Sequence, residues 1–467
     1  MKINIKDLGV LKKAEFDLKP LTIFIGPNNM GKTWTAYALS AVLGSYGLER
    51  FIYEYGQGRA SERFSVLDAA LQSIKAGDNV TLNLVEFIEQ HQASYLKQLI
   101  DVTCQSLPEF MGTNHATFEA LQIAFDIPFT ESSKTQIQQL AIEKHLFAGL
   151  RQKQALFHAL KEENEETLYF YATTKQKILD ELPGIAVRGF IIETMFRAIH
   201  QLVFKTTEPF LYVFPTERST YATIPINKLE DRFTKTEHPY SRGNIPQTET
   251  SLAFIGMLEA AFEAGEINRQ QAIKQYPQIE QYRHIATLLE QQILGGQVDF
   301  STSEPAPWRE LQFQPAHGPT LDMPIVSSMV KELSALVLYL RYLAQPHEWI
   351  IIDEPEMNLH PKAQVQLMEL LAMLVNADIQ VLFTTHSPYM VDHLVNSMKA
   401  ATHPNPATIA NKFYLQRSEA FITQDKVSVM LFDGGDCQSI LNEDGSIAWE
   451  TFSDVSDEIS DLYFEIT

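Results

Sequence analysis

Two glycines that flank four residues and precede a lysine are the strongest chemical signal in this chain of 467 residues. The segment Gly26-Pro27-Asn28-Asn29-Met30-Gly31-Lys32-Thr33 matches G-x-x-x-x-G-K-[ST], the phosphate-binding loop. Backbone N–H groups of such a loop converge on phosphate oxygens, and the helix that follows favours anions at its N-terminus. Lys32 would neutralise the terminal phosphates, and the Thr33 hydroxyl would occupy a Mg²⁺ position. The alternative is an ordinary glycine turn with an exposed lysine.

Two acidic residues follow an apolar segment late in the chain. Trp349–Ile352 reads as a buried strand that ends in Asp353 and Glu354. Asp353 would enter the coordination shell of the metal, and Glu354 would polarise a water molecule that attacks the terminal phosphate. Alone, this pattern is often a plain strand end, but together with the phosphate-binding loop it becomes specific.

A histidine follows a third apolar segment. His386 comes directly after Val381–Thr385, again at the expected end of a strand. A lone histidine is more often a helix cap or a core residue. A neutral imidazole at this edge of a sheet, however, can hydrogen-bond the terminal phosphate and sense its presence.

The elements that must position these groups alternate between strands and helices, which predicts a parallel sheet. Short strands are expected within residues 1–25, a helix over 33–43, strands at 210–214, 349–352 and 381–384, and helices over 328–343 and from Pro361. Residues 60–205 read as helices, including the charged segment 150–166, and so do residues 251–294. Residues 230–250 read as a loop, 298–301 and 310–313 as a hairpin, and 412–415 and 427–432 as antiparallel strands.

The charge balance excludes a protein that coats a polyanion with its whole surface. The 37 Lys and Arg residues face 58 Asp and Glu residues, for a net charge of −21. Ten of the acidic residues and no basic residue fall within residues 431–467. This end is either a solvated edge or a docking surface for a basic partner or a second copy. No signal peptide or membrane-spanning run is present, so we expect a cytoplasmic protein that does not bind membranes.

The order of the motifs resembles the ABC-type ATPase heads of the SMC and RecF group. More narrowly, it resembles the bacterial AAA-15/AAA-21 ATPases, relatives of the OLD ATPases, many of which serve in anti-phage defence. The likeness covers residues 1–45, 205–220 and 320–400. It implies an α/β fold, an ABC-type (SMC/RecF-like) P-loop ATPase head with a mixed sheet and a large helical insertion.

The resemblance also implies a division of the chain and its cofactors. Residues 1–45, 206–220 and 321–467 would form the head, residues 46–205 a helical insertion, and residues 221–320 a second insertion or lid. The cofactors would be ATP and Mg²⁺. Asp353 would be the Walker B acid, Glu354 the catalytic glutamate and His386 the switch histidine.

Ser327 and Ser328 stand where the ABC signature is expected. Two serines at a helix N-terminus can present donors to a phosphate. The sequence departs from the ABC pattern at Met329, where glycine is usual, so an ordinary serine cap is the alternative. Arg218 could touch phosphate, a neighbouring protomer or an acidic residue. His360, in the place of the D-loop, is expected to be structural.

Three functions remain open. The first is an ATP-hydrolysing sensor or scaffold of an anti-phage system, which forms a homodimer or larger homo-oligomer through its heads and acts on a separate effector. The second is a RecF/SMC-like DNA-repair ATPase that clamps DNA, so that a nucleic-acid partner stays open. The third is a nucleotide-gated scaffold with little turnover. Net charge favours the first over the second.

Overall fold

The computed structural model describes residues 1–75, 78–113, 115–116, 118–147, 155–173, 184–206, 211–224, 248–301, 310–448, 461–464 and 466. The chain divides into two compact units. The head unit comprises residues 1–40, 108–122 and 211–467, and the insertion unit comprises residues 41–107 and 123–210. Among the described residues, no helix has the length and apolar character needed to cross a membrane.

A mixed β-sheet forms the centre of the head unit. Within the head unit the strands of this sheet follow the order β1 (Lys2–Leu8), β2 (Leu11–Asp17), β16 (Asp436–Ser439), β15 (Val427–Asp433), β3 (Leu21–Ile25), β14 (Gln380–Thr385), β13 (Trp349–Ile352) and β9 (Leu211–Phe214). The run from β15 to β9 is parallel, and β1–β2 is an antiparallel hairpin. The sheet, and the loop of residues 26–31 between β3 and a helix, confirm the predicted α/β P-loop fold class.

The register of the central strands brings the predicted motifs to one edge of the sheet. Strand β14 lies between β3 and β13, and all three are parallel. Thr385 pairs with Ile25, and Phe383 pairs with Ile352. The carboxyl ends of the three strands therefore lie side by side, directly before the phosphate-binding loop, the acidic pair and His386.

Helices cover the sheet of the head unit. They are α1 (Lys32–Leu43), which continues into the insertion unit, α8 (Arg218–Tyr221), α10 (Glu249–Gln275), α11 (Ile279–Leu288), α12 (Ser328–Leu338), α13 (Pro361–Asn376), α14 (Pro388–Ala401) and α15 (Pro406–Ala410). One face of β3, with Leu21, Ile23 and Ile25, shares a buried core with α10–α14. The predicted helix over 328–343 is confirmed, although its last turn, Tyr339–Leu343, is π-helical, as is Leu289–Leu294 after α11.

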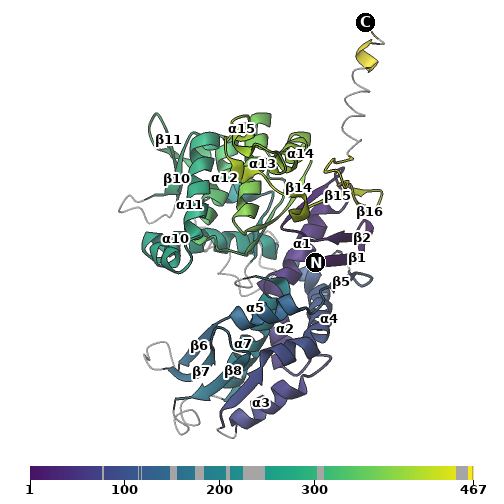
Figure 1. Ribbon diagram of the computed structural model, residues 1–467, viewed down its shortest axis with the longest axis vertical. Coiled ribbons are helices and arrows are strands. Elements are labelled where there is room, and N and C mark those ends of the chain that lie inside the picture. The colour runs from purple at the N-terminus through teal and green to yellow at the C-terminus, as the bar shows by residue number, and fades with distance from the viewer. Residues whose placement is uncertain are drawn as a thin grey trace. The chain divides into compact units, whose positions relative to one another are not determined.

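The insertion unit contains a sheet that the sequence analysis did not predict. Its helices are α2 (Ser45–Gly56), α3 (Ser65–Lys75), α4 (Leu84–Phe110), α5 (Glu131–Gln139) and α7 (Gly184–Phe204), with strand β5 (Gln122–Asp126). Its sheet has the order β4 (Val80–Asn83), β8 (Thr167–Ala172), β7 (Ala155–Lys161), β6 (Ile142–Phe147). Figure 1 shows β6, β7 and β8 side by side, with α7 packed near them.

The predicted helix over 150–166 is wrong. Its described residues, 155–166, form β7 and the turn that follows it, and β7 pairs antiparallel with both β6 and β8. Ala, Leu and Lys favour helices locally, but pairing on both sides and burial of alternate side chains override a propensity of a few tenths of a kcal/mol per residue.

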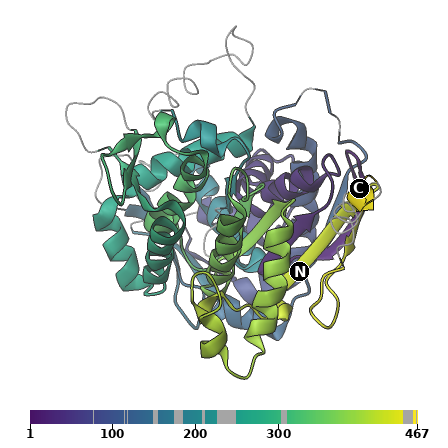
Figure 2. The ribbon, with the colours of Figure 1, turned by 90° about the horizontal axis from the view of Figure 1, so that it is seen from above.

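Two predictions near the C-terminus are corrected as well. Residues 412–415 do not form a strand, because the Glu369 carboxylate accepts the N–H groups of Tyr414 and Leu415 at 2.9 and 2.7 Å in place of a neighbouring strand. Strand β15 is antiparallel to β16, but it is parallel to β3. Figure 2 shows this yellow strand alongside the purple N-terminal strands.

Other predictions fall partly outside the described residues. The hairpin is confirmed as β10 (Gly296–Phe300) paired with β11 (Leu311–Pro315), which also pairs with β12 (Leu321–Asp322). The predicted loop at 230–250 lies almost entirely outside them, and so do residues 449–460 of the acidic end.

The insertion unit contains a fully buried histidine, His200. His200 Nε2 lies 2.9 Å from the carbonyl oxygen of Leu43, which only accepts, so Nε2 carries the proton and Nδ1 accepts from the Tyr95 hydroxyl at 2.8 Å. Burial lowers the pKa of His200 to about 4. Protonation would remove the acceptor that Tyr95 uses.

We predict that the free energy of unfolding falls as the pH is lowered from about 6.5 to about 4. In this range His200 binds a proton in the unfolded state but stays neutral in the folded state. The difference between the pKa of His200 in the unfolded and folded states corresponds to a loss of about 3 kcal/mol in the free energy of unfolding. Chemical denaturation at a series of pH values measures it. The variant His200→Gln should show a flatter profile over this window, and an identical pH dependence in both proteins would contradict the assignment.

Candidate active site

The phosphate-binding loop connects β3 to α1 through three residues with left-handed backbone. Gly26, Asn29 and Gly31 have φ values of 133°, 63° and 91°. A Cβ atom on Gly26 would lie 2.1 Å from the carbonyl oxygen of Phe432 on β15, so this position accepts only glycine. The turn leads directly into the first residue of α1, and Pro27, Asn28 and Asn29 are exposed.

The side chain of Lys32 folds back over the phosphate-binding loop. Its Nζ donates to the carbonyl oxygens of Gly26 at 2.9 Å and Pro27 at 2.7 Å, and the residue is only 5% exposed. Burial lowers the pKa of Lys32, and the carboxylates of Glu354 and Asp353 oppose this shift. The two carbonyl oxygens compensate the positive charge of Lys32 only in part. A phosphate group bound on the loop would compensate it more fully.

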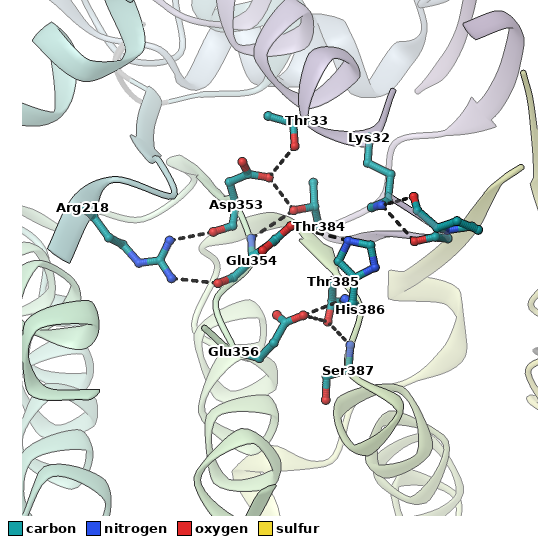
Figure 3. A network of polar contacts seen from close by, with 12 residues as sticks. Lys32, Thr33, Arg218, Asp353, Glu354, Glu356, Thr384, Thr385, His386 and Ser387 are labelled. Atoms are coloured by element: carbon teal, nitrogen blue, oxygen red, sulfur yellow. Dashed lines mark hydrogen bonds and ion pairs between the residues drawn. The ribbon is translucent and has the colours of Figure 1, made fainter. Parts of the chain in front are cut away.

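Asp353 joins the three motifs. Its Oδ1 accepts hydrogen bonds from the Thr33 hydroxyl at 3.0 Å and from the Thr384 hydroxyl at 2.5 Å (Figure 3). Burial raises its pKa. A buried carboxylate beside a threonine hydroxyl is an oxygen donor set that suits Mg²⁺. Thr33 and Asp353 would hold the ion, which would neutralise phosphate charge when bound.

Glu354 directly follows Asp353 and has a left-handed backbone, with φ of 46°. Its N–H donates to the Thr384 hydroxyl at 3.0 Å, and its Oε1 lies 3.5 Å from Nε2 of His386. The hydrogen bond from His386 lowers the pKa of Glu354, so the carboxylate is ionised at neutral pH. It is half-buried and still open to solvent, as a base that activates water requires.

Arg218 donates hydrogen bonds to the backbone of Asp353 and Glu354. It is 1% exposed, and its guanidinium donates to the carbonyl oxygens of Pro215, Asp353 and Glu354 at 2.9, 2.6 and 2.8 Å. Its Nε lies 3.1 Å from Oε2 of Glu332, which is also buried. Of the roles considered above, contact with an acidic residue is the one found.

Glu356 is a further group that the sequence analysis missed. Its Oε1 accepts from the N–H of His386 at 2.6 Å and from the Thr385 hydroxyl at 2.7 Å (Figure 3). Burial raises its pKa. Glu356 therefore fixes the backbone that carries His386. An acidic residue between Pro355 and Met357 was the signal in the sequence, as was Glu332 within the apolar helix α12.

The signature-like serines begin helix α12. Ser327 and Ser328 are exposed at the N-terminus of α12, where the Ser327 hydroxyl accepts from the N–H of Val330 at 3.4 Å. Ser327 thus makes the helix cap named above as the alternative. His360 likewise caps α13, and its Nδ1 accepts from the N–H of Lys362 at 3.3 Å.

Comparison with known proteins agrees with this geometry. A family model described as AAA ATPase domain (AAA-15) matches residues 1–391. A curated relative, an OLD nuclease of Thermus scotoductus, is 21% identical over 412 residues, which are 85% of this chain. The match spans 60% of that relative's length.

Solved SMC heads give weaker matches. The Smc head with an extended coiled coil, bound to the C-terminal domain of ScpA from Pyrococcus furiosus, is 12% identical, with 98% of both chains covered and a TM-score of 0.36. The SMC head of Thermotoga maritima is 10% identical, with 84% of this chain and 90% of that chain covered and a TM-score of 0.28. Scores this low carry no weight in assigning function. On the family match over residues 1–391, the chain belongs to the AAA ATPase domain family.

Proposed function

We propose that the chain binds ATP with Mg²⁺ at this edge of the sheet and hydrolyses it to ADP and phosphate. The observation that carries the proposal is the contact between Thr33 and Asp353, which are 320 residues apart in sequence, with Glu354 directly beside it. The backbone of residues 26–33 would hold the phosphates, and Lys32 would turn from its own carbonyls to the terminal phosphates. Thr33 and Asp353 would hold Mg²⁺.

The carboxylate of Glu354 would accept a proton from the attacking water, because it is ionised and open to solvent. His386, 3.5 Å from that carboxylate, would contact the terminal phosphate or the water. The two residues come from neighbouring strands, so they hold their spacing without a long loop. Glu356 keeps the His386 backbone in place.

We predict that Glu354→Gln preserves ATP binding and lowers the hydrolysis rate at least ~100-fold, because removal of a general base costs 10²–10⁴-fold. Steady-state phosphate release and calorimetric ATP titration measure the two effects. Glu49→Gln, an exposed change in the insertion unit, is the control. Phosphate release by Glu354→Gln near the wild-type rate would eliminate Glu354 as the base.

We further propose that two heads pair head to tail, so that Ser327 or Ser328 reaches the nucleotide of the partner. Both serines are exposed and the Ser328 hydroxyl is at the first turn of α12. Helix N-termini favour phosphate. The chain would then act as a homodimer or larger homo-oligomer with composite sites.

Mixing Lys32→Ala protein with Ser327→Ala/Ser328→Ala protein should restore part of the activity, because each heterodimer keeps one site with both halves intact. The rate per subunit should also rise with protein concentration in the dilute range. Phosphate release during mixing and dilution measures both. Activity that stays strictly proportional to concentration, with a monomeric mass in ATP, would contradict the composite site.

We propose that turnover controls a separate effector, in an anti-phage defence system like those of the related OLD ATPases. The net charge of −21 supports a protein partner more than a DNA clamp. The neighbouring gene separates these alternatives. An adjacent small nuclease or toxin supports defence, whereas replication or repair genes support the DNA-clamping alternative.

A further inference from the structure

The guanidinium of Arg218 uses all three of its nitrogens within the head unit. Nη1 donates to the carbonyls of Pro215 and Asp353, Nη2 donates to the carbonyl of Glu354, and Nε faces Glu332. A planar fork of fixed donors suits several acceptors at once, which a lysine ammonium on a flexible stem does not. Burial of this charge requires that all these partners stay in place.

We propose that Arg218 is a positioning residue for the catalytic glutamate, and that Glu332 ties it to the helix that begins at the signature-like serines. The inference rests on the proposed ATP hydrolysis and assigns residues that set its rate. Arg218 does not contact the reacting atoms. It acts on the backbone of Asp353 and Glu354, the residues that would bind the metal and activate water.

The backbone of Glu354 needs such support. Its left-handed φ of 46° is a conformation that residues other than glycine rarely adopt, because it is energetically unfavourable unless the surroundings hold it. Thr384 accepts its N–H at 3.0 Å, and Arg218 donates to its carbonyl at 2.8 Å. The peptide units on both sides of Glu354 are thus held, which directs its carboxylate toward His386.

Glu332 holds the other end of the same segment. Its Oε1 accepts from Nδ2 of Asn358 at 3.0 Å, while its Oε2 faces Arg218. Asn358 is also left-handed, with φ of 59°. One buried carboxylate of α12 therefore holds residues 353–358 at both ends. A shift of α12 when Ser327 or Ser328 meets a phosphate would reach Glu354 through Arg218.

The test replaces the buried pair by apolar side chains of similar length. Loss of one partner would leave a buried charge, whereas replacement of both by apolar residues is often nearly neutral for stability. In Arg218→Met/Glu332→Met we expect MgATP affinity within twofold of wild type and kcat lowered at least ~10-fold, because small misplacements of a catalytic group cost up to ~100-fold. Arg218→Lys keeps the charge and loses the planar set of donors, so it should also lower kcat. This variant provides the test if the double variant does not fold.

The split between binding and turnover separates positioning from a purely structural role, because a positioning residue changes kcat while the affinity for MgATP stays the same. Folded variants with wild-type kcat would overturn the inference and leave the proposed function standing. A wild-type chain that releases no phosphate from MgATP would overturn both. Arg197→Met, on the partly exposed Arg197–Glu193 pair of the insertion unit, is the matched control and should leave kcat unchanged.

Discussion

The Asp353 carboxylate accepts hydrogen bonds from Thr33 on one side and Thr384 on the other, at 3.0 and 2.5 Å. These contacts join the first turn of α1 to the ends of β13 and β14, three elements that are far apart in the sequence. A buried carboxylate is costly unless its oxygens are satisfied. The parallel register of β3, β14 and β13 therefore has to bring those hydroxyls together. The same register positions the phosphate-binding loop, which begins at the carboxyl end of β3.

The segment from Asp353 to Asn358 extends this constraint. It leaves the strand through a left-handed Glu354 and reaches α13 through a left-handed Asn358. Side chains from three directions hold it, namely Arg218 after β9, Glu332 on α12 and Thr384 on β14. In return, Glu356 within the segment holds the backbone of His386. Asp353, Glu354 and His386 are thus parts of one hydrogen-bonded network at the same edge of the sheet.

The motifs at the strand ends could be predicted because glycine, lysine and paired acids have few uses at such spacing. The support around them could not, because Arg218 and Glu332 are 114 residues apart and only the fold makes them neighbours. Strand β7 was missed because its residues favour helices locally, and only β6 and β8 make it a strand. The segment 412–415 was misassigned because the acceptor for its N–H groups is one side chain, Glu369, which no periodicity reveals.

The most direct test of this account is a calorimetric titration of the full chain with ATP and Mg²⁺, repeated with Lys32→Ala and with Lys97→Ala, an exposed lysine of α4. In the proposed function, Lys32 and the loop that it contacts form the phosphate site, which predicts saturable binding to the wild type and to Lys97→Ala. Binding to a folded Lys32→Ala variant should be lost or weakened at least ~100-fold, because a buried charged contact to phosphate is worth several kcal/mol. Equal ATP affinity in the three proteins, or no binding to the wild type, would contradict it.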